Sequence, residues 1–356
     1  MPNASEELTA RDEAIERGLD FIYRFGNTQK CFEKYGSFVI CCFALVSATS
    51  HDPKLRSLGR ERAKQLLRRW SKIHPFVPAD ASSDLLLEFV LVHYAQSRIG
   101  LADVAGAGSI RLTARNFSAS DLLGFDPCRE APPDDLPYRC DCTFQNARGR
   151  KVCKQCKRRL RIRSRYKVWM EALANTYVAE RSGVVFGATY ADVLKWMPVM
   201  RPYPDDGDEE VLRDAIYAVT HIVYTLNDYG TYRLARRWLP REFAFLKANV
   251  ASACTRKDPE ILGELLDSLK ALGLGVNHPL INRGARYLLA AQNEDGSWGD
   301  ASEDNERTRC HTTWTAIDGL RTYAWRGERL HPAIKSVLTG ANGAKYEVGR
   351  KRRRRE

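Results

Sequence analysis

Apolar residues recur at helical spacing along most of the chain. In residues 5–25 an aliphatic or aromatic residue returns about every 3.6 positions, which predicts an amphipathic helix. Residues 38–47 are apolar on nearly every side and predict a buried helix, whereas residues 54–73 carry charges on one face and predict an outer helix. Further helices are predicted at residues 85–97, 166–181, 190–197, 210–228, 234–252, 258–272, 279–292 and 310–324.

The pattern predicts an all-α chain with one interruption. No stretch shows the sustained alternation of a β-strand. Residues 100–150 break the helical rhythm with paired Gly and Pro residues, which is typical of an insertion. The predicted parts are helical residues 1–100, an irregular insertion at residues 101–165, a second helical part at residues 166–345 and a basic tail at residues 346–356.

Two internal similarities relate distant parts of the chain. Residues 15–22 and 281–288 share the pattern I-x-R-G-x-x-aromatic-aliphatic, which suggests two helix pairs built alike. A second pattern, H-x-x-aromatic-T-x-x-D, occurs twice, and on a helix its His, Thr and Asp share one face. Its members are His221, Tyr224, Thr225 and Asp228 in the first copy and His311, Trp314, Thr315 and Asp318 in the second.

Residues 281–320 resemble two related enzyme families. The segment with Gln292, Gly296 and Trp298 resembles the QW repeat of terpene cyclases, and Cys310-His311-Thr312 with Trp314 resembles the start of an inner helix in protein prenyltransferase β subunits. The resemblance implies an α/α toroid, a ring of inner and outer helices, and gives His311 the role of a zinc ligand. The D-x-D-D and D-D-x-x-D motifs of those families are absent from the sequence, so the resemblance concerns the fold more than the reaction.

In such a ring the two histidines face one cavity. We expect His221 and His311 to bind a catalytic zinc or iron ion, with Cys310 or Glu264 as a third ligand. Glu264 lies on the intervening helix, where it shares a face with Glu260 and Asp267. The alternative is structural, because a buried His or Asp also needs hydrogen-bond partners. The remaining predicted site residues are Asp228 and Asp318 as catalytic groups that contact the ligands or the substrate, and Tyr224, Trp314, Thr225 and Thr315 as substrate-binding residues.

Four cysteines have the spacing of a structural metal site. Cys140 and Cys142 precede Cys153 and Cys156 by ten residues, and two close pairs can complete a tetrahedral set of thiolates around zinc. A closed site of this kind leaves no position for a substrate, so we assign it a structural role. Disulfides are the alternative, and Cys128 is a possible substitute ligand.

The positive charge of the chain is concentrated in two segments. The net charge is +12, yet residues 148–167 hold eleven Lys or Arg and no acid, and residues 350–356 hold six Lys or Arg against one Glu. The segment 158–167, which begins with Arg158 and ends with Lys167, therefore predicts contact with nucleic acid or an acidic partner, as does the tail. A strand with one solvated basic face is the alternative.

These observations predict a metal-dependent enzyme on an α/α toroid, acting as a transferase or cyclase on a small apolar or isoprenoid-like substrate. The rival hypothesis is a non-enzymatic zinc-knuckle scaffold that binds nucleic acid or an acidic protein. The longest apolar run, residues 38–46, is too short to span a bilayer, and residues 1–25 lack the pattern of a signal peptide, so we expect a cytoplasmic protein.

Overall fold

The computed structural model describes residues 4–142, 144–205, 208–302, 305–329, 331, 332, 334 and 337, and most of these residues lie in helices. This confirms the predicted helical character. Two short strands, β1 (Leu136–Pro137) and β2 (Ile162–Arg163), pair antiparallel. The predicted basic tail, residues 346–356, lies outside the described residues.

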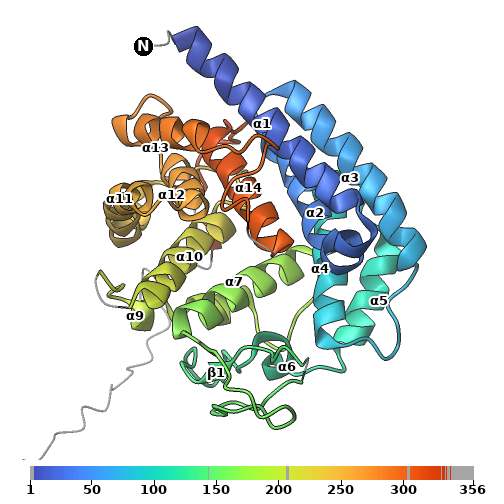
Figure 1. Cartoon of the computed structure of the whole chain (residues 1–356). Coiled ribbons are helices and arrows are strands. Elements are labelled where there is room, and N and C mark those ends of the chain that lie inside the picture. The colour runs from blue at the N-terminus through green and yellow to red at the C-terminus, as the bar shows by residue number, and fades with distance from the viewer. Residues whose placement is uncertain are drawn as a thin grey trace, which may run out of the picture.

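Six helices form the inner part of the molecule. Each contacts the next in chain order, and the last also contacts the first (Figure 1). On α12 every residue after the initial proline is buried, which explains why its sequence is so largely apolar. The six are α2 (Gln29–Thr49), α4 (Ser83–Arg98), α7 (Arg165–Arg181), α10 (Glu209–Leu226), α12 (Pro259–Ala271) and α14 (Glu306–Leu320).

Other helices pack against the inner ones. In Figure 1, α3 (Pro53–Ile73) covers α2, and α11 (Pro240–Thr255) and α13 (Pro279–Ala290) cover α12. α3 buries Leu55, Leu66 and Trp70 and exposes its charged face, as predicted for an outer helix. The remaining elements are α1 (Ala4–Asn27), α5 (Val104–Ala114), α6 (Ala119–Leu123), α8 (Tyr190–Leu194), α9 (Met197–Met200) and the 3₁₀ helix η1 (Arg236–Trp238).

The inner helices α10, α12 and α14 run in the same direction. Glu260, near the start of α12, bonds to His311 near the start of α14, whereas Lys270 at the end of α12 bonds to the carbonyl of Asp318 near the end of α14. The same order holds between α10 and α12, where the contacts are Tyr217 with Glu260 and Tyr224 with Glu264. Equivalent levels of these helices therefore face one another.

The segment that resembles a QW repeat joins the two ends of the chain. Gln292 Nε2 donates to the carbonyl of Ala14 at 2.8 Å, and the buried Trp298 ring packs against Gly18 of α1. Gly296 has a φ of 88°, and a Cβ there would lie 2.5 Å from the carbonyl oxygen of Arg17. Only glycine fits this turn, so the segment ties the last helix pair to α1 (Figure 1).

Two predictions about where helices lie are wrong. α5 and α6 lie within the region expected to be irregular, and they pack against α4 and α7. Asp103 starts α5 by accepting from two backbone N–H groups, which outweighs the glycines that follow. α10 ends at Leu226, and Asp228 lies beyond it with a φ of 56°, so the predicted face shared with His221 does not exist.

One helix of the described residues has the length and composition of a membrane span. α2 is 21 residues long, because it extends well before the apolar run seen in the sequence, and its mean hydropathy over the best window is 1.4. Within the molecule 72% of that window is buried, as in the core helix of a soluble protein, so the criterion is weak evidence for a membrane.

Candidate active site

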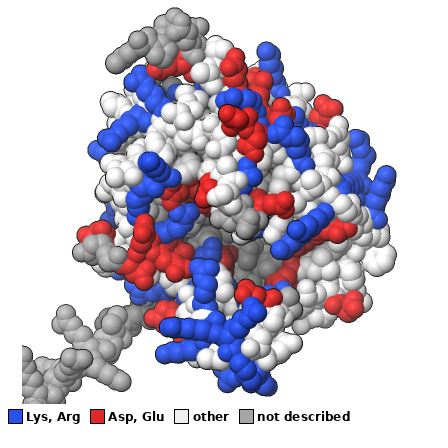
Figure 2. Space-filling model, viewed as in Figure 1, with Lys and Arg blue, Asp and Glu red and all other residues white. Residues whose placement is uncertain are grey.

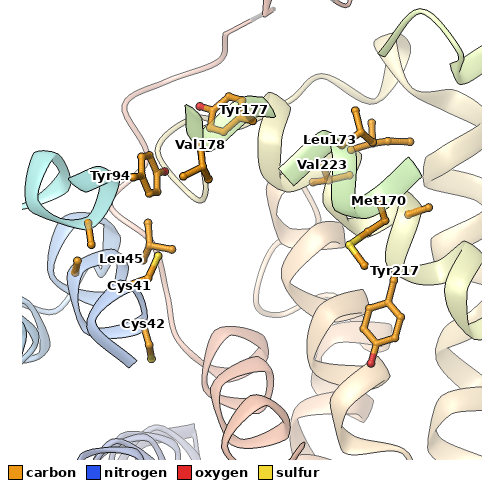
Figure 3. Close-up of a cluster of buried hydrophobic side chains, with 14 of the residues drawn as sticks. Cys41, Cys42, Leu45, Tyr94, Met170, Leu173, Tyr177, Val178, Tyr217 and Val223 are labelled. Atoms are coloured by element: carbon orange, nitrogen blue, oxygen red, sulfur yellow. The ribbon is translucent and has the colours of Figure 1, made fainter. Parts of the chain in front are cut away.

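A cavity of about 180 Å³ lies between the six inner helices. Cys41 and Leu45 of α2, Tyr94 of α4 and Val178 of α7 border the same space from facing helices (Figure 3). The rest of its wall comes from α10, α12, α14 and the segment after α14. The complete lining is Phe38, Cys41, Leu45, Leu91, Tyr94, Val178, His221, Tyr224, Tyr229, Glu264, Asp267, His311, Trp314, Thr315, Asp318, Arg321 and Tyr323.

The cavity gathers most of the site residues expected from the sequence. Both copies of the repeated pattern contribute, as does the helix between them. The predicted residues in the lining are His221, Tyr224, Glu264, His311, Trp314, Thr315 and Asp318.

Three predicted site residues lie elsewhere. Thr225 is buried against Tyr190, with 2.8 Å between the two hydroxyl oxygens. Asp228 accepts from Tyr177 at 2.6 Å and from Arg98 at 3.0 Å. Cys310 is fully buried and is not part of the cavity wall. Thr225 and Asp228 therefore hold helices together, and Cys310 belongs to the core.

Glu260 organises one end of the cavity. Its carboxylate accepts hydrogen bonds from Tyr217 at 2.5 Å and Arg213 at 2.8 Å, and it bonds to Nδ1 of His311 at 2.5 Å. Burial alone would raise the pKa of Glu260, but the charge and hydrogen bond of His311, together with Arg213 and Tyr217, lower it to about 2. Glu260 is thus a carboxylate that fixes the His311 ring.

His221 is held in one tautomer. Its Nδ1 lies 2.8 Å from the carbonyl oxygen of Tyr217, and because a carbonyl only accepts, Nδ1 must carry the proton. Burial lowers the pKa of His221 to about 3, against a smaller opposing effect of that hydrogen bond. His221 is therefore neutral, with an unprotonated Nε2 available in the cavity.

Glu264 has the opposite character. Burial raises its pKa to about 8, although a hydrogen bond donated by Thr220 favours the ionised form. At neutral pH the side chain is therefore mostly a carboxylic acid. The lining of the cavity thus includes a neutral imidazole and a neutral carboxylic acid.

A second group of polar side chains lies at the far end of the cavity. Arg321 donates to Asp318 at 2.6 Å and stacks on the Tyr323 ring at 4.0 Å. Lys270 donates to the backbone carbonyls of Asp318 and Arg321 at 2.8 and 2.6 Å. Burial and the neighbouring Asp318 raise the pKa of Asp267 to about 7, while Lys270 and Arg321 oppose the shift.

The sequence motifs did not identify several residues of this site. Tyr217 and Arg213 precede the repeated pattern, and Arg321 and Tyr323 follow it, so no motif contained them. The available signal was spacing, since Tyr217 lies four residues before His221 and therefore on the same helix face.

The four predicted cysteines meet in the insertion. The Sγ atoms of Cys140 and Cys156 lie 3.3 Å apart, and those of Cys142 and Cys153 lie 3.6 Å apart. All four are free thiols within 4.8 Å of one another, close enough to bind one metal ion. Cys128 is exposed and does not join them. Among the described residues no other group of three His, Cys, Asp or Glu meets this distance, so the predicted ligands of a cavity metal are not brought together in this way.

Part of the basic segment is neutralised. Arg158, Arg161 and Arg163 form ion pairs with Asp141, Glu210 and Glu171. Ile162 and Arg163 form strand β2, which agrees with the predicted alternative of a strand with a basic face. Figure 2 nevertheless shows Lys and Arg gathered at the end of the molecule where Figure 1 places the insertion.

A comparison with known protein families gives a match to part of the chain. Residues 144–317 match a family model described as a domain of unknown function (DUF6895). The match begins within the cysteine insertion and ends in α14, so it includes both cavity histidines. No curated protein and no solved structure matches the chain.

Elemental analysis of the purified protein tests the metal sites. We expect about one metal ion per chain. It should be lost in Cys156→Ser and kept in Cys128→Ser, because Cys156 belongs to the four-cysteine cluster and Cys128 does not. His311→Ala should also keep it. A second ion that disappears with His311→Ala would instead establish the cavity metal expected from the sequence.

The protonation of Glu264 predicts how stability depends on pH. Because its pKa is about 8 when folded and about 4.5 when unfolded, its contribution to stability is lost as pH rises from about 4.5 to 8. Glu264→Gln should not show this loss. Between pH 5 and pH 8 the free energy of unfolding of the variant should therefore rise by up to ~4 kcal/mol relative to that of wild type. Urea unfolding at both pH values measures this, with the exposed Glu13→Gln as control. Parallel pH profiles for wild type and Glu264→Gln would mean that Glu264 is ionised.

Proposed function

We propose that the protein is an enzyme built on an α/α toroid, with its active site in the cavity between the inner helices. The toroid is supported by the order of contacts from α2 to α14, by the return contact of α14 with α2, and by the parallel direction of α10, α12 and α14. The joint between the QW-like segment and α1 supports it further, because it brings the ends of the chain together.

The observation that carries the enzymatic proposal is the pairing of His221 and Glu264 in one cavity. A neutral imidazole can accept a proton at its unprotonated Nε2, although the lowered pKa of His221 makes it a weak base, and a buried carboxylic acid with a pKa of about 8 is suited to act as a general acid near neutral pH. In the proposed reaction His221 Nε2 removes a proton from the bound molecule and Glu264 supplies one to another of its atoms. Proton transfer at two atoms is the chemistry of isomerisation, addition or elimination.

The cavity restricts the substrate to a small molecule. A dry protein cavity of about 150 Å³ binds a molecule the size of benzene, and this one measures about 180 Å³. Aromatic and aliphatic side chains form most of the wall, which suits a mainly apolar skeleton. An isoprenoid-like substrate would fit here only as a short branched unit.

We propose zinc as the ion of the cysteine cluster, in a structural role, because four thiolates are its preferred closed set. A catalytic zinc or iron at His221 and His311 remains a prediction from the sequence. Both rings have the anchored Nδ1 that metal-binding histidines have, which is the observation in its favour. The acid–base proposal does not depend on it.

Incubation with a small-molecule cell extract, followed by mass spectrometry, tests the enzymatic proposal. Wild type and the surface control Lys247→Ala should convert the same compounds. His221→Asn and Glu264→Gln should convert them at least ~100-fold more slowly, the usual effect of losing a general acid or base. Equal conversion by wild type and both cavity variants contradicts the proposal.

A second candidate function is nucleic-acid binding by the insertion. Several basic residues there have no ion pair among the described residues, and they surround the cysteine cluster. Such a positive surface attracts phosphates irrespective of sequence. The residues concerned are Arg150, Lys151, Lys154, Lys157, Arg159 and Arg165.

Binding to random single-stranded oligonucleotides at several salt concentrations tests this candidate. Replacing Lys151, Lys154 and Arg159 with Gln should weaken binding about tenfold or more and flatten the salt dependence. The same charge change on α3, at Lys54, Arg60 and Lys72, is the matched control. Equal losses in the two triple variants would mean that the insertion is not a binding surface.

A further inference from the structure

The lining of the cavity includes polar atoms without hydrogen-bond partners. Tyr94 Oη, Asp267 Oδ1 and Trp314 Nε1 are buried and make no hydrogen bond within the described part of the protein. Tyr94 and Asp267 expose only 1% and 6% of their surface, and all three residues line the same cavity. Buried polar atoms are normally paired, because an unpaired one costs about 1–3 kcal/mol. Tyr94 Oη and Asp267 Oδ1 can both accept, so these two oxygens point to a bound molecule that carries a hydrogen-bond donor.

The positive groups near this wall are already engaged. Arg321 donates to Asp318, Thr49 and Ser50, with its guanidinium stacked on Tyr323. Lys270 is not part of the lining, and its two hydrogen bonds go to backbone carbonyls. Asp267 Oδ1 is therefore a buried acceptor, on a residue that lines the cavity, without a donor of its own.

Aromatic faces surround the same space. The rings of Tyr94 and Tyr229 have centroids 6.1 Å apart, and those of Tyr229 and Tyr224 are 6.2 Å apart. On the opposite side Phe38 and Trp314 lie 4.8 Å apart. Aromatic faces attract cations, and the attraction is stronger where water is excluded. A carboxylate oxygen next to such faces is the environment of an ammonium group.

Resting on the proposed function of the cavity, we propose that its ligand is a small protonated amine with a branched apolar skeleton. The ammonium group donates to Asp267 Oδ1 and Tyr94 Oη and contacts the tyrosine faces, while the skeleton lies against Leu45 and Val178. An anion in this position would face Asp267 and Asp318, and an uncharged group would add no positive charge to those that Lys270 and Arg321 place near Asp267.

The raised pKa of Asp267 agrees with this assignment. Burial first, and then the nearby Asp318, raise it to about 7 in the protein alone, against Lys270 and Arg321 and a hydrogen bond from Tyr323. A positive charge placed at Oδ1 stabilises the ionised carboxylate. The bound amine would therefore add a positive charge to those of Lys270 and Arg321 and favour the ionised Asp267.

Calorimetric titration of the full chain with three molecules of one skeleton tests the inference. We expect 3-methylbutan-1-amine to bind at least about tenfold more tightly than 3-methylbutan-1-ol, and 3-methylbutanoate to bind most weakly. Asp267→Asn and Tyr94→Phe keep the shape of the wall and should each weaken amine binding several-fold to tenfold while leaving alcohol binding within about twofold. Their melting curves confirm that they are folded.

The outcomes separate this inference from the enzymatic proposal. Equal affinity for amine and alcohol, tighter binding of the carboxylate, or an amine affinity unaffected by Asp267→Asn overturns the amine assignment. The absence of amine binding also overturns the amine assignment. If His221→Asn nevertheless abolishes turnover in the extract experiment, the enzymatic proposal stands. Selective amine binding without any conversion in that experiment leaves the amine site in place and removes the enzymatic proposal.

Discussion

The arrangement of the cavity depends on the carboxylate of Glu260. A buried carboxylate is costly unless several donors surround it, and here they come from α10 and α14 while Glu260 itself belongs to α12. The three helices must keep one register for these bonds to form together. Tyr217 connects this group to the other histidine, because its hydroxyl bonds to Glu260 and its carbonyl accepts from His221. One carboxylate thus orients both imidazoles.

Close packing of α12 on α14 makes that register possible. A Cβ on Gly263 would lie 2.3 Å from the carbonyl oxygen of Thr315, and one on Gly319 would lie 2.9 Å from Gly263 Cα. Any side chain at these positions would push the helices apart and lengthen the bond between Glu260 and His311. Burial among the inner helices gives His221 and Glu264 their unusual protonation states. Burial disfavours charge in both, so it lowers the pKa of the base and raises that of the acid.

Much of this site could be predicted because helical periodicity determines which side chains share a face. His221, Tyr224, His311 and Trp314 of the repeated pattern line the cavity, and the four cysteines whose spacing predicted a metal site lie close together. The placement of Asp228 was wrong because α10 ends two residues before it. Asp228 has a left-handed backbone, so it does not continue the helix face that the repeated pattern assumes. The role of Glu260 depends on contacts between three helices that are distant in sequence. Spacing within one helix cannot reveal such contacts.

The insertion and the cavity are mechanically connected although their chemistry differs. Ser164 follows β2 directly, caps α7 through the N–H of Lys167, and donates to Asp214 of α10 at 2.8 Å. Arg163 pairs with Glu171 on α7, so the end of the insertion is attached to both helices at their N-terminal ends. Asp214 is adjacent to Arg213, one of the donors to Glu260. A metal ion that stiffens the insertion would therefore restrain the beginning of the inner helices, at the level where Glu260 holds the two histidines.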